Sequence, residues 1–378
     1  MGILLLIAAQ GFNIWGTILG IRHFGLYHSQ PKMKTTRERP FPQPISILKP
    51  VKGIDGNLCQ NLESFFHLQY IRFEILFSVA EETDLAVPII RSLIEKYPSI
   101  NARLIIANHN MGLNPKVNNL AQSYSEAQYE WILISDSNIR VDSQYLFAAT
   151  EHFTSDVGVV TAVVSGREPQ QLGAWLEAVF LNTFYARWMF LARELGNPAV
   201  IGKSMLFRKS DAERFGGLKT LSLYLAEDYM AGVSMVQLNR RIEIMSQPVV
   251  QPLGEYSFKT FWARHIRWGR IRKSQAPLVF TFEPLLTFWI SGLFGAVSLK
   301  ALCGVPFFIT ISVHTALWLA SDLIMMNVTQ SGLGWRSSFF WILRETLYIP
   351  MWIHIAAGRT VLWRGRKLTL ARGGLLES

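Results

Sequence analysis

The sequence predicts an α/β fold with a central globular domain between membrane-associated ends. Half of the 378 residues are hydrophobic and the mean hydropathy is +0.21, which is high for a soluble protein. The apolar residues are concentrated at the two ends of the chain, while the middle alternates short β-rich runs with amphipathic helical stretches. This alternation predicts a mostly parallel, Rossmann-like sheet with helices on both faces, accompanied by transmembrane and interfacial helices.

The first element is an apolar run from Ile3 to Ile21, interrupted only by Gln10 and Asn13. A run of this length can cross a bilayer as a helix. A secretory signal peptide would carry its basic residues before the apolar core, whereas here they follow it, at Arg22, Lys32, Lys34, Arg37 and Arg39. We therefore expect residues 1–24 to form a transmembrane anchor, with the next segment in the cytosol.

The proline-rich stretch Pro40–Pro44 marks the start of the domain that we expect to cover residues 40–275. Its predicted strands are Ile45–Leu48, Phe73–Val79, Arg103–Ala107, Trp131–Ser135 and Val157–Val164. Its predicted helices are Leu58–His67, Leu85–Tyr97, Pro115–Ser123 and Ser143–His152. Ligands of such sheets bind at the carboxyl ends of the parallel strands, so the residues that follow these strands are candidates for a site.

Two later stretches, Leu172–Leu195 and Ser257–Lys273, mix aromatic side chains with charged ones and are too charged to span a membrane comfortably. We expect both to be interfacial helices of the same domain, lying on the membrane or under the active site. Three apolar segments follow and predict C-terminal membrane helices within residues 280–360: Pro284–Leu299, Ala301–Ser321 and Ser338–Gly358. Three spans here would put the basic tail, residues 361–378, outside, against the positive-inside tendency, so the number of spans stays open by one.

The net charge of +10 raises the possibility of a nucleic-acid partner. The basic residues gather beside apolar segments, in Arg22–Lys52, Arg264–Lys273 and Arg359–Arg372. That placement is typical of cytoplasmic flanks that meet anionic headgroups, and it disfavours nucleic-acid binding. The two cysteines, Cys59 and Cys303, cannot form a disulfide framework, which favours a reducing, cytosolic surrounding for the domain.

Asp136 is the first candidate for chemistry, because it follows directly after the buried strand Trp131–Ser135. In enzymes that use nucleotide sugars, a carboxylate at this place holds a divalent cation against the donor diphosphate. The usual pattern is Asp-x-Asp, and here Asn138 stands at its third position. A helix cap is the alternative role of such an aspartate.

Glu227 and Asp228 are the catalytic candidates. They lie near the start of a predicted helix, where the helix dipole favours a negative charge. A carboxylate kept ionised there can act as a general base on an acceptor hydroxyl. The alternative is an acidic pair that only stabilises the first helical turn.

The segment Arg264–Trp268 places Arg264 and Arg267 three residues apart, on one face of a helix, where both can address a diphosphate. Trp268 can pack against a sugar or the lipid boundary. A basic amphipathic helix that only holds the membrane surface is the alternative.

Three further residues are candidates for nucleotide-sugar binding. Lys49 ends the first strand, Asp84 follows the second, and Lys116 lies at the start of the helix after Asn114-Pro115. Any one of these residues alone indicates little about nucleotide-sugar binding. The prediction rests on the order in which they occur along the chain.

In this order the motifs resemble those of the ceramide glucosyltransferase family, within the wider group of lipid-directed glycosyltransferases. The resemblance runs from about Pro44 to Arg272, with a weaker part at Trp363–Gly374. It rests on five motifs: Lys49-Pro-Val-Lys-Gly53, Gly112-Leu-Asn-Pro-Lys116-Val-Asn-Asn119, Ser135-Asp-Ser137 followed by Ile139-Arg140-Val141, Ala226-Glu-Asp228-Tyr229, and Arg264-x-x-Arg267-Trp268.

The resemblance implies a GT-A catalytic domain with a mixed sheet on the cytosolic face of a multi-pass membrane protein. It implies a UDP-glucose donor, a divalent cation (Mg or Mn) and inversion at the anomeric carbon. Asp84 would bind the nucleotide, Asp136 the metal and diphosphate, and Asp228 would be the base. Arg264, Arg267 and Trp268 would hold the leaving diphosphate and shape the acceptor site. Two departures are Asn138 in the metal motif and Glu81-Glu82 before Asp84.

The leading hypothesis is therefore glucose transfer from UDP-glucose to the primary hydroxyl of ceramide, at a lipid bilayer and without nucleic acid. One alternative is transfer of glucose or N-acetylglucosamine to a hopanoid or glycerolipid. The other is a catalytically silent module that binds the membrane.

Overall fold

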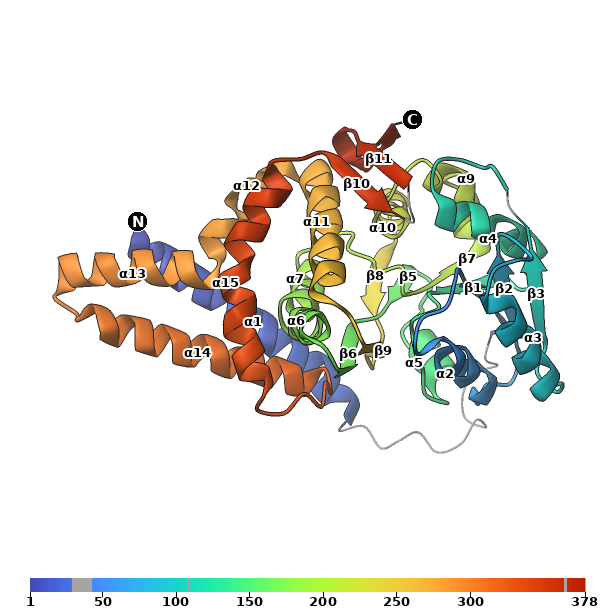
Figure 1. Cartoon of the computed structure of the whole chain (residues 1–378), viewed down its shortest axis with the longest axis horizontal. Coiled ribbons are helices and arrows are strands. Elements are labelled where there is room, and N and C mark those ends of the chain that lie inside the picture. The colour runs from blue at the N-terminus through green and yellow to red at the C-terminus, as the bar shows by residue number, and fades with distance from the viewer. Residues whose placement is uncertain (29–42, 108, 364–365, 378) are drawn as a thin grey trace. The chain divides into compact units, whose positions relative to one another are not determined.

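The computed structural model describes residues 1–28, 43–107, 109–363 and 366–377 (Figure 1). The chain divides into two compact units, each assembled from separate segments of the sequence. Unit 1 consists of Met1–Gly25, Ser165–Leu191 and Leu253–Ser378, and unit 2 of Leu26–Val164 and Ala192–Pro252. The basic residues Lys32, Lys34, Arg37 and Arg39 of the predicted cytosolic flank lie outside the described residues.

Unit 2 is built on a seven-stranded sheet with the order β3-β2-β1-β4-β7-β5-β8. Its strands are β1 (Ile45–Pro50), β2 (Phe73–Val79), β3 (Ala102–Ile106), β4 (Trp131–Ser135), β5 (Val157–Thr161), β7 (Ser204–Arg208) and β8 (Arg241–Ile244). The first four strands are parallel to one another, whereas β7 runs antiparallel to both of its neighbours. The α/β class with a mixed sheet is therefore confirmed.

Helices flank this sheet, and together they enclose its apolar core. They are α2 (Leu58–Glu63), η1 (Ser64–His67), α3 (Ala86–Lys96), α4 (Pro115–Glu126), α5 (Tyr145–Thr150), α8 (Lys209–Glu213), α9 (Gly217–Leu221) and α10 (Glu227–Gln237). Val117 and Leu120 of α4 are fully buried and pack in one cluster with Leu48 of β1 and Ile134 of β4. This packing fixes α4 against the strands whose carboxyl ends carry the candidate residues.

The predicted strands Phe73–Val79 and Trp131–Ser135 are confirmed with the same bounds. The predicted single strand Val157–Val164 is wrong, because β5 ends at Thr161 and a separate strand, β6 (Val164–Pro169), begins at Val164. Strand β7 was not predicted, because its residues Ser204–Arg208 are mostly buried and follow no clear alternation.

Unit 1 is mainly helical. Its elements, some of which extend past the limits of the unit, are α1 (Gly2–His28), β6, α6 (Leu172–Phe180), η2 (Leu181–Tyr185), α7 (Ala186–Glu194), β9 (Val249–Gly254), α11 (Phe258–Gln275), α12 (Pro277–Phe282), η3 (Glu283–Leu286), α13 (Phe288–Cys303), α14 (Phe307–Val328), α15 (Ser337–Ala356), β10 (Thr360–Trp363), β11 (Arg366–Leu370), η4 (Arg372–Gly374) and β12 (Leu376–Glu377). Figure 1 shows α13 and α14 as a long hairpin, and α11 beside α15.

Among the residues that the structure describes, two helical stretches are long and apolar enough to cross a membrane, Gly2–Gly25 in α1 and Phe307–Val328 in α14. A third span results if Pro277–Leu286 and α13, which meet at 55°, are counted as one broken span. The expected segment Ala301–Ser321 is wrong in its bounds. Gly304 adopts a left-handed conformation with φ of 70° and ends α13, so the next helix starts only at Phe307. Helix α15 carries Arg344 and Glu345 and is not among the candidates, so its span stays a prediction.

A buried ionic cluster holds the helices of unit 1 together. Asp322 of α14 has no exposed surface, and its Oδ1 lies 2.5 Å from Nη2 of Arg187 in α7. Its Oδ2 accepts hydrogen bonds from Nε1 of Trp341, at 2.6 Å, and from Nη2 of Arg344, at 3.3 Å. Charged side chains inside an apolar helix bundle are costly unless they are paired, as these are. Arg187 therefore belongs to the interior of the unit rather than to a membrane-surface helix.

Candidate active site

Helix α4 brings Lys116 into the middle of an acidic cluster in unit 2. Asn114 caps the helix, because its Oδ1 accepts hydrogen bonds from the backbone N–H groups of Lys116 and Val117, and Pro115 occupies the first helical turn. The ammonium group of Lys116 then lies 2.8 Å from Oδ1 of Asp136 and 2.8 Å from Oε1 of Glu227. It also donates a hydrogen bond to the carbonyl oxygen of Gly202 at 3.3 Å. The motif that begins at Gly112 therefore shapes the helix start that positions this lysine.

The pKa of Lys116 reflects this surrounding. Burial alone would lower it, but the negative charges of Asp136, Glu227 and Asp228 outweigh burial and raise the pKa above its ordinary value. The lysine is therefore a permanent cation near neutral pH.

Asp136 follows β4, as the sequence predicted, and lies among basic groups. Its backbone N–H donates to the carbonyl of Lys203, and its own carbonyl oxygen accepts a hydrogen bond from Nζ of Lys49 at 2.7 Å. Burial works against the charged carboxylate, but Lys116 and Lys203 lower the pKa of Asp136 below its usual value. Its side chain keeps 29% of its surface exposed, so the carboxylate is ionised and accessible.

Asp228 lies in the first turn of α10, beside Glu227. Its Oδ2 accepts a hydrogen bond from the backbone N–H of Gly202 at 2.7 Å, and its Oδ1 accepts one from the N–H of Tyr229 at 2.8 Å. Burial and the negative charge of Glu227 raise the pKa of Asp228 to about 6, although Lys116 acts in the opposite direction. A carboxylate that titrates near neutral pH has the proton affinity that a general base requires.

Two residues of this site were missed from the sequence, Gly202 and Lys203. A Cβ atom at position 202 would lie 2.9 Å from Nζ of Lys116 and 3.1 Å from Oδ2 of Asp228, so only glycine lets the two groups approach this backbone. Nζ of Lys203 donates a hydrogen bond to Oδ1 of Asn138 at 3.1 Å. The Gly-Lys pair directly before the unrecognised strand β7 was the available signal.

Lys49 and Asp84 occupy the same edge of the sheet but make mainly structural contacts. Lys49 has no exposed surface, its Nζ lies 3.7 Å above the ring of Phe65, and burial lowers its pKa. Both carboxylate oxygens of Asp84 accept a hydrogen bond from the N–H of Gly53, and one also accepts from the N–H of Ala86. Asp84 thus fastens the loop after β1 to the start of α3. Its role in nucleotide binding stays a prediction.

The structure brings together five predicted residues, namely Lys49, Lys116, Asp136, Glu227 and Asp228. Arg264, Arg267 and Trp268 belong to unit 1, on helix α11. The guanidinium group of Arg264 lies 4.7 Å from the centre of the Trp268 ring and 3.3 Å from Oε1 of the buried Glu177. Their predicted part in holding a diphosphate stays a prediction.

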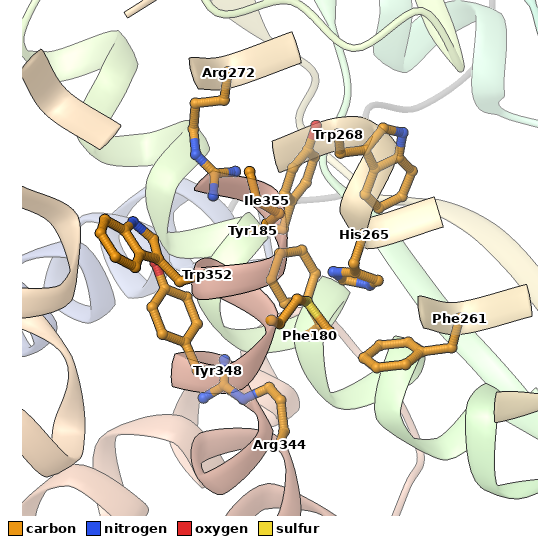
Figure 2. A pocket seen from close by; sticks show the side chains of 11 residues that line it. Phe180, Tyr185, Phe261, His265, Trp268, Arg272, Arg344, Tyr348, Trp352 and Ile355 are labelled. Atoms are coloured by element: carbon orange, nitrogen blue, oxygen red, sulfur yellow. The ribbon is translucent and has the colours of Figure 1, made fainter. Parts of the chain in front are cut away.

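A small cavity lies beside Trp268 and the neighbouring His265, whose Nε2 lies 2.8 Å from Oε2 of Glu177 (Figure 2). Phe180, Phe261, Tyr348 and the other side chains in Figure 2 line it. Its volume of about 30 Å³ corresponds to a single water molecule. This cavity is therefore too small for a sugar or a lipid headgroup. Burial lowers the pKa of His265, so its ring is neutral near pH 7.

The donor groups of the site bear on the divalent cation that the resemblance implies. The described residues contain no group of three His, Cys, Asp or Glu side chains arranged to hold a metal ion. The ammonium of Lys116 fills the centre between Asp136 and Glu227, and the amide oxygen of Asn138 accepts from Lys203. This arrangement does not fit a metal held by protein groups alone, and Asp136 as a metal ligand stays a prediction.

Comparison with known proteins gives the family. The model of glycosyl transferase family 21 matches residues 12–376. The chain belongs to glycosyl transferase family 21. It is 33% identical to ceramide glucosyltransferase 1 of Caenorhabditis elegans over 340 residues, which cover 88% of this chain and 73% of the relative. It is 27% identical to the ceramide glucosyltransferase of Komagataella phaffii, over 97% of this chain and 90% of the relative. A family 21 member with such relatives is a hexosyltransferase.

This family 21 chain is also similar to solved structures. The mannosyltransferase PcManGT from Pyrobaculum calidifontis, in complex with GDP-Man and Mn2+, is 15% identical, with a TM-score of 0.48 over 94% of this chain and 98% of that structure. The glucosyl-3-phosphoglycerate synthase from Mycobacterium tuberculosis, in complex with Mn2+ and UDP, is 14% identical, with a TM-score of 0.36 over 70% of this chain and 81% of that structure.

Proposed function

We propose that this family 21 hexosyltransferase moves glucose from UDP-glucose to the primary hydroxyl of ceramide and gives β-glucosylceramide. The observation that carries the proposal is the convergence of Asp136, Glu227 and Asp228 on Lys116, at the carboxyl ends of β1 and β4. Relatives named as ceramide glucosyltransferases support the choice of donor sugar and acceptor.

In the proposed reaction the acceptor hydroxyl attacks the anomeric carbon of the donor from the side opposite the diphosphate. A carbon–oxygen bond to the acceptor forms as the bond to the phosphate oxygen breaks, and the bonding electrons leave with UDP. Asp228 accepts the hydroxyl proton, for which its pKa of about 6 is suited. A single displacement of this kind converts an α-linked donor into a β-glycoside.

Lys116 is the group that we assign to the leaving diphosphate. A fixed ammonium in a partly buried site stabilises the negative charge that develops on the phosphate oxygens. Asp136 and Glu227 hold this ammonium from two sides and thereby define its position.

The proposed work of a divalent cation, Mg or Mn, is therefore to accompany the donor rather than to occupy a protein site. Titration with Mn²⁺ in the presence and absence of UDP tests this. We expect weak binding without UDP and stronger binding with it, and Asp136→Ala to weaken both UDP binding and cation dependence. Tight Mn²⁺ binding without UDP, which Asp136→Ala abolishes, would contradict this role.

A screen of purified protein tests the reaction itself. Donors are UDP-glucose and UDP-N-acetylglucosamine, and acceptors are ceramide, diacylglycerol and bacteriohopanetetrol. We expect UDP-glucose with ceramide to give the highest rate, and the proton coupling at the anomeric centre of the product to report a β-linkage. Faster transfer to a hopanoid or glycerolipid would favour the alternative in which that lipid is the acceptor. No transfer to any acceptor would favour a catalytically silent module that binds the membrane.

We also propose that the protein is an integral, multi-pass membrane protein with unit 2 on the cytosolic face. The apolar stretches Gly2–Gly25 and Phe307–Val328 support insertion into a bilayer. Cys59 and Cys303, both among the described residues, are free thiols. Free thiols agree with a reducing compartment.

A further inference from the structure

An open groove of about 620 Å³ runs along one side of α11 in unit 1. Helix α15 and strand β10 form its other walls, and these elements lie side by side in Figure 1. The volume falls within the range of about 300–1,000 Å³ that is typical of small-molecule sites. Unlike the small cavity in Figure 2, this groove is large enough for part of an amphiphile.

The walls of the groove are fixed by hydrogen bonds between its elements. Nε1 of Trp262 donates to Nδ1 of His354 at 3.0 Å and joins α11 to α15. Nζ of Lys273, further along α11, donates to the carbonyl oxygen of Gly358, just before β10, at 3.2 Å. Gly269 lets the two helices approach closely, since a Cβ there would lie 2.2 Å from Cδ1 of Ile355. The groove is therefore preformed, which reduces the ordering cost of binding.

The chemistry of the lining has two parts. Apolar side chains cover one part, among them Trp262, Leu347 and Leu362. Leu362 keeps 72% of its surface exposed and so offers apolar area to a ligand in the groove. The other part is basic, with Lys259, Arg267 and Arg270, and no Asp or Glu is among the described residues that line the groove.

We propose that this groove binds an anionic phospholipid of the surrounding membrane, with the phosphate at Lys259 and an acyl chain along Leu362. The charge of the lining decides the occupant. The proposed acceptor, ceramide, is uncharged and would gain nothing from the basic groups, whereas a phosphate forms strong charge-assisted hydrogen bonds with them. A free nucleotide would leave the apolar wall exposed. This site goes beyond the proposed function, because its ligand is neither donor nor acceptor.

The bound lipid would hold α11 at the level of the headgroups. A basic amphipathic helix is attracted to anionic lipids through its cations and through its buried apolar area, and the groove offers both to one molecule. Turnover should then depend on anionic phospholipid even when donor and acceptor are saturating.

Native mass spectrometry of the full chain released from detergent micelles tests the proposal. The probes are phosphatidylglycerol and phosphatidylcholine with the same acyl chains. We expect the parent protein to retain one phosphatidylglycerol in preference to phosphatidylcholine, and the double variant Lys259→Glu/Leu362→Asp to bind phosphatidylglycerol about tenfold or more weakly, since reversing a charge removes an attraction and adds a repulsion. Lys219→Glu, an exposed charge reversal on α9 in unit 2, is the matched control and should bind like the parent.

Three results would overturn the proposal: equal retention of the two lipids, equal retention by parent and double variant, or displacement of the lipid by UDP, which would assign the groove to the donor. If the double variant does not fold, Lys259→Gln replaces it, and unchanged preference for phosphatidylglycerol in that variant counts against the site. The proposed glucosyl transfer is judged separately, from the acceptor screen, and does not depend on which lipid is retained.

Discussion

Nζ of Lys116 lies 2.8 Å from Oδ1 of Asp136, so that a residue predicted to bind the donor and the residue predicted to ligate a metal form one ion pair. Glu227 contacts the same ammonium at 2.8 Å. One permanent cation thus balances a group of buried carboxylates that would otherwise repel each other. The fold and the proposed chemistry both depend on this lysine.

Replacing Lys116 by methionine removes the cation and keeps the length of the side chain. We expect the free energy of unfolding at pH 8 to fall by about 3–5 kcal/mol, as for other buried ion pairs that lose one partner. The loss should be smaller at pH 5, because the remaining carboxylates can then take up protons. Thermal unfolding in detergent at both pH values measures this, with the exposed Lys219→Met as control. A loss that is equal at both pH values would show that packing, rather than charge, is the cause.

The pH dependence of turnover should report on Asp228. Since burial and Glu227 raise its pKa from 3.8 to about 6, the carboxylate becomes an effective base only as the pH rises through about 6. We expect kcat to increase over this range, and Asp228→Asn to lower it by about 10²–10⁴-fold while UDP binding persists. Asp142→Asn, an exposed aspartate in the same unit, is the control. A turnover that Asp228→Asn leaves unchanged would remove Asp228 from the mechanism.

The same residue should weaken the fold at high pH. A carboxyl group with a higher pKa in the folded than in the unfolded chain binds more protons when folded, so its contribution to stability falls as the pH rises from 3.8 to about 6. Asp228→Asn removes this penalty. We therefore expect the variant to unfold at a higher temperature than the parent at pH 8, and at nearly the same temperature at pH 4. A variant that is less stable than the parent at pH 8 would contradict the raised pKa.

Gly202 offers a test of the close approach at the site. In Gly202→Ala the new Cβ would lie 2.9 Å from Nζ of Lys116 and 3.1 Å from Oδ2 of Asp228, so both groups must move. Because small displacements of reacting groups reduce rates strongly, we expect kcat to fall by about 10²-fold. Gly56→Ala is the matched control, since a Cβ there meets no atom within 4 Å. Similar kcat values for the two variants would show that the site tolerates the methyl group.

The sequence was sufficient for the parts of the fold that local patterns determine. The strand Trp131–Ser135 and the helix start at Pro115 follow from an apolar run and from a cap with proline, and Asp136 and Lys116 follow from them. What it could not supply was long-range pairing. The contact between Gly202 and Asp228 joins a loop to a distant helix, and no local periodicity marks it. For the same reason the antiparallel strand β7 and the buried pairing of Arg187 with Asp322 became visible only in the folded chain.

The two native cysteines can test the proposed orientation of unit 2. Cys59 of α2 is exposed in unit 2, and Cys303 is exposed at the end of α13 in unit 1. In the variant Cys303→Ala, a membrane-impermeant maleimide should label Cys59 only after the cytoplasmic membrane of intact cells has been opened. Cys59→Ala/Cys303→Ala is the control for background labelling. Labelling of Cys59 in intact spheroplasts would place unit 2 outside and overturn the cytosolic orientation.

The ionic cluster around Asp322 should be essential for the stability of unit 1. Asp322→Asn leaves the guanidinium groups of Arg187 and Arg344 inside the helix bundle without their common carboxylate, while it preserves the shape of the side chain. Removing one partner of a buried pair costs about 3–5 kcal/mol, because the remaining charge is desolvated without compensation. We therefore expect a clearly lower midpoint of thermal unfolding in detergent and less protein in the membrane fraction. The exposed Asp142→Asn, which makes the same chemical change in unit 2, should leave both quantities near the parent values. Because Asp322 contributes nothing to the proposed chemistry, the folded fraction of Asp322→Asn should retain the parent kcat. A stable variant with reduced kcat would instead assign the cluster to the reaction.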